Sequence, residues 1–420
     1  MPLLKLAFKS LWNRRFTALL TLFSIALSVT LLLGVERLRT EARSSFANTI
    51  SGTDLIVGAR SGPIPLLLYS VFRIGDATNN ISWQSYQDII KNRHVAWSIP
   101  LSLGDSHKGF RVLGTTPAYF QHYRYGHKQS LVFRQGVPFA GVYDAVLGAE
   151  VEAKLHYRLG QKIILAHGAG EVSLFKHSNK PFTVVGILAR TGTPVDRTVH
   201  VSLKGIEAIH IDWHGGNRPL PGMSMSASAA LKQDLTPKTI TAFLLGLKSR
   251  ISAFSVQRYI NNYSQEPLLA ILPGVALQQL WDMMGIAEKA LMAISLLVVL
   301  VGLTGMATVI LTSLNERRRE MAILRSVGAR PLQVFLLIMG EAVSLTVLGT
   351  ILGLVLLYAL LWLGQPFIAT QFGLFINIDW PSNYEYALLG ILFVASLLVS
   401  FIPAYRAYRY SLSDGMTIRI

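Results

Sequence analysis

The chain has 420 residues, of which 51% are hydrophobic and only 15% are charged, and its mean hydropathy is +0.42. Soluble domains carry about 25% charged residues, so this composition excludes an ordinary soluble protein and indicates an integral membrane protein. The formal net charge of +16 does not indicate a nucleic-acid partner, because the basic residues do not gather into one patch interleaved with aromatic residues. The absence of cysteine excludes disulfides and thiolate chemistry.

Four long apolar runs organise the sequence, and each is close to the roughly 20 residues that span a bilayer. In chain order the expected divisions are a cytoplasmic interfacial helix at 1–15, a transmembrane helix at 16–35, a periplasmic α+β domain with stalk helices at 36–285, a second transmembrane helix at 286–314, a charged cytoplasmic helix at 315–331, a third transmembrane helix at 332–363, a short periplasmic loop at 364–385, a fourth transmembrane helix at 386–405 and a cytoplasmic tail at 406–420.

The distribution of basic residues predicts the orientation of these helices. Segments 1–15, 315–331 and 406–420 carry four, five and three Lys or Arg, whereas 363–385 carries none. Because short loops rich in Lys and Arg stay on the cytoplasmic side, we expect a multi-pass protein with both termini in the cytoplasm. The same rule places residues 36–285 outside the cytoplasm.

The large segment 36–285 has the pattern of a mixed domain. Short apolar runs bounded by turn residues predict strands, of which the clearest are 145–148, 182–188 and 198–201. Residues 149–158 have helical composition and end at Gly160. The predicted fold class is therefore a polytopic α-helical membrane protein with four transmembrane helices and a large α+β domain between the first and second of them.

The stretch 315–331 between the second and third apolar runs predicts a short charged helix. Met321, Leu324 and Val327 recur at three-residue steps, and Gly328 followed by Pro331 is a usual helix stop. A signal that only orients the membrane helices needs neither an apolar stripe nor a glycine cap, so we interpret this helix as a docking element. Its candidate contact residues are Glu316, Arg317, Arg318, Arg319, Glu320, Met321, Leu324, Arg325, Val327 and Gly328.

Read as Asn-Glu-Arg…Arg-Glu-Met-Ala-Ile-Leu-Arg-Ser-Val-Gly-Ala, this stretch resembles the cytoplasmic loop of FtsX-like permeases, the membrane subunits of MacB-type and LolC/LolE-type ABC transporters. The runs Val146–Ile163 and Phe182–Leu188, and the sequence Pro403-Ala404-Tyr405-Arg406-Ala407, are similar to the same family. The resemblance implies a bacterial inner-membrane location and a coupling helix that docks on a cytoplasmic ABC ATPase dimer. It also implies a second permease copy, identical or similar, and a possible periplasmic partner protein. Membrane lipids would surround the helices of this chain.

No catalytic motif is present in the sequence. A phosphate-binding loop requires Gly-x-x-x-x-Gly-Lys, and the dipeptide Gly-Lys does not occur. We therefore expect a non-catalytic subunit without a cofactor of its own, with ATP and Mg²⁺ bound by the partner ATPase. The resemblance implies mechanotransmission, in which ATP hydrolysis drives a periplasmic conformational change that acts on a lipoprotein, a peptide or a partner protein. Two alternatives stay open: a non-transporting regulator of a periplasmic cell-wall hydrolase, and a component of zinc homeostasis.

All ten histidines lie between His94 and His214, which is within the expected outer domain. The sequence His210-Ile-Asp212-Trp-His214 places two imidazoles one helical turn apart if the segment is helical, and such spacing suits zinc. We name His210, Asp212 and His214 as a speculative metal site. A pair of histidines without a third ligand is more often part of a core or a surface.

Three residues of the third apolar run have a predicted role in membrane packing. Glu341 is an ionisable group seven residues into the run, and the resemblance implies that it is structural and lies near the cytoplasmic interface rather than in a substrate or proton path. Gly349 and Gly353 form a Gly-x-x-x-Gly pattern, which predicts close helix packing within a permease dimer.

Overall fold

The computed structural model describes residues 15–168, 175–213, 224–316, 318–372 and 378–409. The chain forms two compact units. We call the first, Met1–Ala42 with Met284–Ala369 and Ile376–Ile420, the membrane unit, and the second, Arg43–Met283 with Thr370–Phe375, the outer unit. The interfacial helix expected at 1–15 lies outside the described residues except for Arg15, and so does the tail from residue 410 onward.

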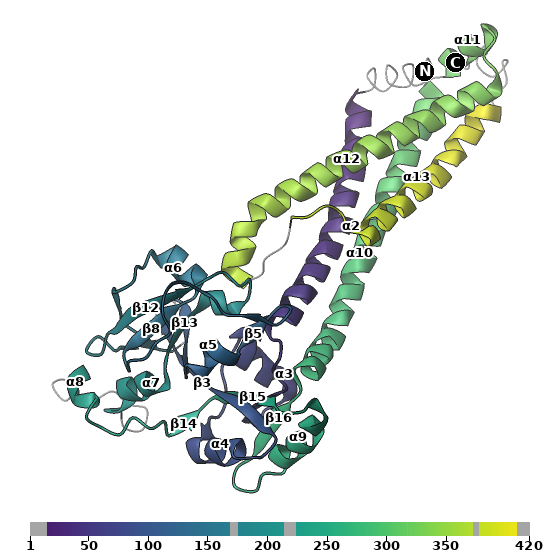
Figure 1. Cartoon of the computed structure of the whole chain (residues 1–420). Coiled ribbons are helices and arrows are strands. Elements are labelled where there is room, and N and C mark those ends of the chain that lie inside the picture. Colours follow the sequence, from purple (N-terminus) through teal and green to yellow (C-terminus); the bar gives the residue numbers. More distant parts are fainter. Residues whose placement is uncertain (1–14, 169–174, 214–223, 317, 373–377, 410–420) are drawn as a thin grey trace. The chain divides into compact units, whose positions relative to one another are not determined.

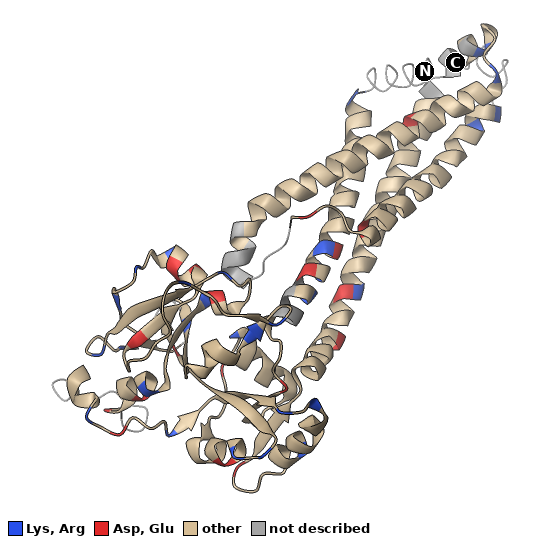
Figure 2. Ribbon diagram, viewed as in Figure 1, with Lys and Arg blue, Asp and Glu red and all other residues tan. Residues whose placement is uncertain are grey.

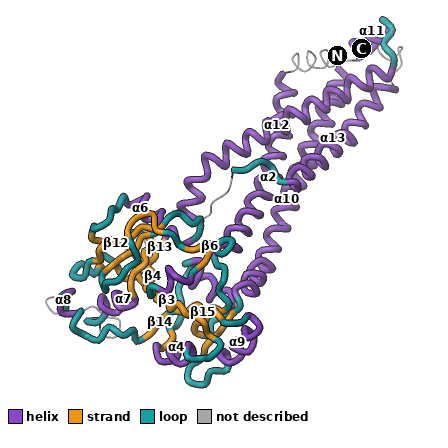
Figure 3. The backbone as a smooth tube through the Cα atoms, viewed as in Figure 1, coloured by secondary structure: helices purple, strands orange, loops and turns teal. Residues whose placement is uncertain are grey.

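The membrane unit is built from long apolar helices and one short connecting helix (Figures 1 and 3). The helices are α2 (Arg15–Thr49), α10 (Pro273–Glu316), α11 (Arg318–Ser326), α12 (Pro331–Phe372) and α13 (Asn383–Arg409), of which α2 and α10 also contribute residues to the outer unit. Within the described residues, four segments are long and apolar enough to cross a membrane, namely Arg15–Glu41, Pro273–Leu314, Pro331–Gln365 and Asn383–Arg409. Figure 2 shows that the middle parts of these helices carry few charged residues.

Helix α12 extends farther than the sequence indicated. The apolar run in the sequence ends the third transmembrane helix at residue 363. The helix continues to Phe372, and neither Gly nor Pro occurs between Phe367 and that end. Part of the segment expected as a loop is therefore helical.

Small residues bring the membrane helices α2 and α12 close together inside this chain. A Cβ atom at Gly353 would lie 2.7 Å from the carbonyl oxygen of Ala26, and one at Gly349 would lie 2.7 Å from the side chain of Ile25. Thr30 also donates a hydrogen bond of 2.9 Å from its Oγ1 to the carbonyl oxygen of Gly353. The Gly-x-x-x-Gly pattern therefore packs α12 against α2 of the same chain, and the expected dimer face at these glycines is corrected accordingly.

The outer unit is a mixed α+β domain. Its strands are β1 (Leu55–Ala59), β2 (Ile81–Ser82), β3 (Val95–His107), β4 (Phe110–Thr115), β5 (Arg124–Tyr125), β6 (Gln129–Ser130), β7 (Phe133–Gly136), β8 (Asp144–Leu147), β9 (Lys162–Ile163), β10 (Ala166–His167), β11 (Phe175–Lys176), β12 (Phe182–Leu188), β13 (Thr198–Ser202), β14 (Thr239–Ile240), β15 (Ala242–Leu247) and β16 (Leu268–Ile271). Its α-helices are α3 (Pro63–Leu67), α4 (Trp83–Ile90), α5 (Ala118–His122), α6 (Ala149–Leu155), α7 (Leu203–His210), α8 (Ala227–Ala230) and α9 (Ala253–Asn261).

The main sheet has the strand order β16-β1-β15-β3-β4-β13-β8-β12-β7, and the long strand β3 connects its two halves. On one side of β3 the pairings are antiparallel, from β3 to β15, from β15 to β1 and from β1 to β16. On the other side, β13 is parallel to β4, and β12 is parallel to β8. The short strand β10 adds to β3, with His167 opposite Asp105.

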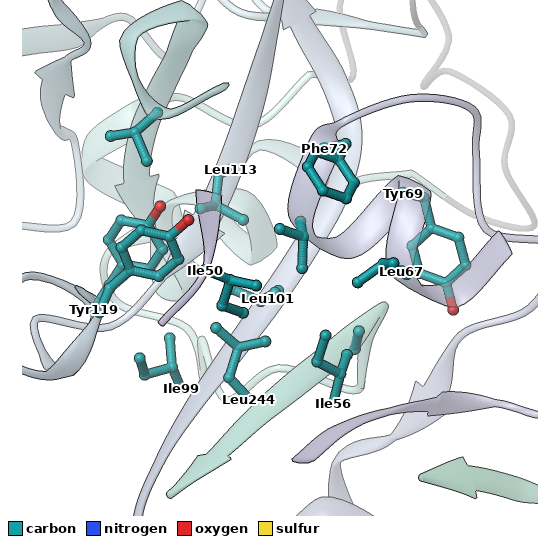
Figure 4. Close-up of a cluster of buried hydrophobic side chains, with 14 of the residues drawn as sticks. Ile50, Ile56, Leu67, Tyr69, Phe72, Ile99, Leu101, Leu113, Tyr119 and Leu244 are labelled. Atoms are coloured by element: carbon teal, nitrogen blue, oxygen red, sulfur yellow. The ribbon is translucent and has the colours of Figure 1, made fainter. Parts of the chain in front are cut away.

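Strand β1 is buried on both faces, which explains why it has no polar side chain. Leu55 and Val57 lie in one buried cluster, whereas Ile56 lies in another, because successive side chains of a strand point to opposite faces. Figure 4 shows the second of these clusters, in which Ile56 lies near Ile99 and Leu244. A strand that is covered on both faces reads as a continuous apolar run.

Candidate functional site

Helix α11 and the turn after it connect α10 to α12 at one end of the membrane unit (Figure 1). The turn depends on Gly328, which has a φ of 102° and donates a backbone hydrogen bond of 3.1 Å to the carbonyl oxygen of Arg325. Nothing lies within 4 Å of the position that a Cβ would take at Gly328, so backbone conformation rather than crowding favours glycine there. Pro331 then begins α12, and the Gln333 side chain accepts a hydrogen bond from the Arg330 amide at 2.9 Å.

The apolar residues of this connector do not form the single exposed stripe that the sequence indicated. Met321 is 6% exposed and belongs to the buried cluster of the membrane helices, whereas Val327 is 84% exposed. Six residues correspond to about 600° of helical rotation, so these two side chains lie about 120° apart around the axis. Ile323, which is 55% exposed, is four residues from Val327 and therefore shares its face.

The other predicted contact residues are described in part. The side chains of Glu316, Arg318, Arg319, Glu320 and Leu324, and all of Arg317, lie outside the described structure. Arg325 is half-buried. Among the described residues of the connector, Ile323 and Val327 form an exposed apolar pair that another protein could cover.

A buried ion pair lies at the opposite end of the membrane helices. Arg37 of α2 donates from Nε and Nη2 to the two carboxylate oxygens of Glu385 in α13, and each contact is 3.1 Å long. Both side chains are less than 10% exposed. Tyr358 of α12 joins this group through a contact of 3.4 Å to Arg37 and donates to the carbonyl oxygen of Asp379 at 2.8 Å. Two-point pairing of this kind holds helices α2 and α13 in one register.

The sequence analysis did not single out this ion pair, although one signal was present. Ser382 and Glu385 form a capping box, in which the Glu385 carboxylate accepts from the Ser382 amide at 2.7 Å and the Ser382 hydroxyl accepts from the Glu385 amide at 3.2 Å. A pocket of about 230 Å³, lined mainly by polar and charged residues, adjoins them. Its lining residues are Glu36, Arg37, Thr40, Glu41, Asp379, Trp380, Ser382 and Glu385.

Glu341 faces the protein rather than the lipid. Its side chain is only 5% exposed within α12. An ionisable group at membrane depth is costly unless protein or water surrounds it, so this placement suits a packed interior position. Its structural role stays a prediction.

The predicted metal residues of the outer unit separate into two groups. Asp212 pairs with the buried Lys180, with 2.7 Å between Oδ1 and Nζ, and accepts from the Met225 amide at 2.8 Å. His214 lies outside the described residues. His210, at the end of α7, lies instead near Asp105, with 3.5 Å between Nε2 and Oδ1. Spacing along the sequence therefore identified His210 but not its neighbours in space.

Two further histidines accompany His210 and Asp105. His167 in β10 has its Nδ1 3.4 Å from Oδ1 of Asp105, and these three residues hold their ligand atoms within 4.8 Å of one another. The His177 ring lies 5.0 Å from the His210 ring, and its buried Nε2 has no hydrogen-bond partner among the described residues. We call Asp105, His167, His177 and His210 the histidine cluster.

The electrostatics of the histidine cluster follow from burial and from its single carboxylate. Burial alone would raise the pKa of Asp105, but the imidazoles of His167 and His210 hold it below its usual range. Burial would lower the pKa of His210, yet the contact with Asp105 outweighs burial and raises it. Burial lowers the pKa of His177 to about 4, so that ring is neutral near pH 7. The cluster therefore contains an ionised carboxylate and at least one neutral imidazole.

Comparison with known families covers most of the chain. Residues 18–245 match the MacB-like periplasmic core domain, and residues 292–412 match the FtsX-like permease C-terminal domain. The chain is 24% identical over 415 residues to a macrolide export ATP-binding/permease protein MacB of Nitrobacter winogradskyi. That alignment covers 96% of this chain and 58% of the relative. A MacB of Burkholderia pseudomallei is 30% identical over 127 residues, which are 29% of this chain and 18% of that protein.

Two solved structures show only a weak likeness. The periplasmic region of MacB from Actinobacillus actinomycetemcomitans has a TM-score of 0.33 at 11% identity, covering 55% of this chain and 94% of that one. The extracellular domain of the noncanonic ABC-type transporter YknZ from Gram-positive bacteria has a TM-score of 0.31 at 12% identity, covering 52% and 99%. The assignment rests on the family models, of which the periplasmic core model alone spans more than half of the chain. This chain therefore belongs to the MacB-like, FtsX-type permeases of ABC transporters and is a multi-pass inner-membrane protein.

Proposed function

We propose that this chain is the membrane subunit of an ABC transporter in which α11 receives the movement of a cytoplasmic ATPase and the outer unit acts on a periplasmic client. The main support for this proposal is the connector, which consists of α11 and the turn that follows it up to Pro331. It lies between two membrane helices, ends at a glycine with positive φ, and exposes Ile323 and Val327 beside basic residues. An apolar anchor within a charged rim is the usual composition of a small protein contact.

The proposed orientation places both termini and α11 in the cytoplasm. The basic residues at 1–15, 315–331 and 406–420 support it. The chain has no cysteine, so single cysteines report cleanly. Ile251 and Val327 are 92% and 84% exposed. A membrane-impermeant thiol reagent should label Ile251→Cys but not Val327→Cys in cells with a permeable outer membrane, and the reverse pattern would overturn the orientation.

The docking role is tested by introducing charge on the exposed face of α11. We expect Ile323→Asp and Val327→Asp each to reduce co-purification of the ATPase subunit and its stimulated ATP hydrolysis by at least about tenfold, because a charge would be buried at a contact centre. Ile251→Asp, at a still more exposed isoleucine of the outer unit, is the control and should change neither. Membrane levels of each variant are measured by immunoblotting.

The turn after α11 gives a second, independent test. Gly328→Val places a β-branched residue at a φ of 102°, which costs of order 1–3 kcal/mol and shifts the connector without altering the docking surface. Gly305→Ala in α10, where a Cβ has open space, is the matched control. If the α11 variants and Gly328→Val all retain wild-type ATPase coupling, α11 is not a docking element.

For the molecule on which the outer unit acts, which we call the client, we propose only a chemical class. A lipoprotein, a peptide or a partner protein is compatible with a large extracytoplasmic domain, and the transporter is proposed to contain a second permease copy. Gly349 and Gly353 do not support that dimer, since they pack within one chain. Cross-linking of the purified complex followed by mass spectrometry identifies the client. A cell-wall hydrolase as the cross-linked partner would instead support the regulatory alternative.

A further inference from the structure

Asp105, His167 and His210 have a separation that matches metal coordination better than hydrogen bonding. The Asp105 carboxylate lies 3.4 Å from Nδ1 of His167 and 3.5 Å from Nε2 of His210. Hydrogen bonds between a charged donor and a carboxylate are about 2.7–2.9 Å long, so both contacts are long for that purpose. Zinc–ligand bonds of about 2.0–2.1 Å in a tetrahedral site place two ligand atoms about 3.3–3.4 Å apart, close to the observed separations.

Unused polar atoms around these residues point to a ligand. Nε2 of His177 is buried and has no hydrogen-bond partner among the described residues, and the buried Nε2 of His210 has only the long contact of 3.5 Å with Asp105. His177 itself is only 3% exposed. Leaving a buried polar atom without a good partner is costly, so an unpaired imidazole nitrogen and two long contacts around one carboxylate need a common explanation. A cation that accepts lone pairs from several imidazoles supplies one.

The fold holds the residues of the histidine cluster in place, and they do not form a chance grouping of surface side chains. Asp105 is only 4% exposed, and its strand β3 pairs with β10 so that His167 stands directly opposite. The helix α7 brings His210 from another part of the chain. The Trp213 ring lies 5.2–5.6 Å from the rings of His167, His177 and His210 and forms an aromatic wall beside them.

We propose that Asp105, His167 and His210 bind a divalent transition-metal ion of the zinc type, with the His177 ring beside them, 5.0 Å from the His210 ring. Imidazole nitrogens with one carboxylate oxygen suit Zn²⁺ and Co²⁺, whereas Mg²⁺ and Ca²⁺ prefer oxygen ligands throughout. The ion ties together β3, β10 and the end of α7, which are distant in sequence. Asp212 is not a ligand, because Lys180 and the Met225 amide occupy its carboxylate. This site is independent of ATPase coupling.

The test uses the full-length chain in detergent, purified through an affinity tag that contains no histidine and stripped with a chelator. Binding of Zn²⁺ is measured by calorimetry, and Co²⁺ is followed by its visible absorption as a four-coordinate ion. We expect one saturable ion per chain in the wild type. We also expect Zn²⁺ to raise the melting temperature of the wild type.

Variants locate the site. His167→Ala replaces a side chain that is 50% exposed, and Asp105→Asn keeps the size of the buried carboxylate, so both variants should fold. Each should weaken Zn²⁺ binding at least 100-fold, because even partners outside the coordination shell contribute about 10–100-fold. His127→Ala, at an exposed histidine outside the cluster, is the control and should bind as the wild type does.

Two results would overturn the site. One is the absence of saturable binding in the wild type. The other is binding that is equal in the wild type, His167→Ala and Asp105→Asn, which would assign the metal to surface histidines. The melting temperature without metal shows whether each variant is folded before its affinity is compared.

Discussion

The membrane unit and the outer unit treat buried charge in different ways. In the membrane unit, the Arg37 guanidinium meets the Glu385 carboxylate at two points of 3.1 Å, and the carboxylate also caps its own helix. In the outer unit, the buried Asp105 carboxylate has imidazole nitrogens at 3.4 and 3.5 Å, and the buried Nε2 of His177 beside the His210 ring lacks a hydrogen-bond partner among the described residues. In the first group both carboxylate oxygens are paired by short contacts, and Nη1 of Arg37 is the buried atom left without a partner among the described residues, whereas in the second group the carboxylate itself has only long contacts.

This difference separates a structural charge from a binding charge. A buried ion pair persists when good geometry offsets the desolvation of both partners, so short two-point contacts indicate a role in packing. A buried polar group with long contacts and unused lone pairs is desolvated, but its contacts offset only part of the desolvation free energy. Such groups are typical of functional sites.

Removing one partner of the membrane ion pair should have the largest effect. Arg37→Met leaves the Glu385 carboxylate buried without its cation, and the loss of one partner of a buried pair costs about 3–5 kcal/mol. We expect a large drop in the melting temperature in detergent and lower abundance in the membrane. Arg37→Met combined with Glu385→Gln should recover most of the loss, because no unpaired charge remains. Arg409→Met, at an exposed arginine of α13, is the control, and an equally stable Arg37→Met would contradict a packing role.

Overfilling the contact between α12 and α2 should have the next largest effect. A side chain at Gly353 would meet the Ala26 backbone at 2.7 Å, so Gly353→Val forces the helices apart and should cost about 3 kcal/mol, at the upper end for an overpacked core. Gly340→Val on the same helix has open space around its Cβ and should be neutral or slightly stabilising, because Val has a higher helix propensity than Gly. Thermal unfolding of the two variants side by side gives the comparison. Equal stabilities would show that these glycines do not pack within the chain.

His200 should have a smaller effect, on the pH dependence of the free energy of unfolding. Unlike His167 and His210, it is a buried imidazole without a carboxylate partner. Its side chain is fully buried, its Nε2 has no partner among the described residues, and burial lowers its pKa to about 3. The unfolded state, with a pKa near 6.5, binds the proton more readily, so stability is present above about pH 6.5 and falls as the pH drops toward 3. Between pH 7 and pH 5 this histidine should account for a loss of ~2 kcal/mol.

The variant His200→Leu isolates that contribution. Its unfolding free energy should depend less on pH than that of the wild type between pH 7 and pH 5, whatever its absolute stability. Denaturant unfolding at the two pH values measures the difference between the two slopes. Identical slopes would mean that His200 is not held neutral in the folded protein.

Much of the fold could be predicted from the sequence, because its signals are local. The four apolar runs correspond to four helices long enough to cross a membrane, and the run 182–188 coincides with β12. The strand expected at 198–201 is β13, which continues one residue farther to Ser202. The helix expected at 149–158 ends at Leu155, where His156 adopts a positive φ of 53°. Element type follows from residue pattern, whereas element ends depend on tertiary contacts.

The sites were harder to predict, because they depend on pairings between distant segments. The glycines at 349 and 353 indicated a close helix contact, but a single sequence does not specify which helix faces them. His210 was identified from its neighbour in sequence, whereas its actual neighbours follow from the register that sets His167 opposite Asp105. Likewise, the rotation of α11 that buries Met321 and exposes Val327 depends on how that helix lies against the others. Such information is tertiary and has no local pattern.

Glu385 has a consequence for how the membrane unit opens. One carboxylate both caps the first turn of α13 and pairs with Arg37 of α2, so the start of the helix and the contact between helices depend on the same atoms. Fraying of that first turn would release a charge that is otherwise buried, and it is therefore suppressed. The amides at the start of α13 should exchange their hydrogens with solvent together with the breaking of the ion pair, as one cooperative unit. A helix end, ordinarily the first part of a helix to loosen, is in this protein tied to the stability of the bundle.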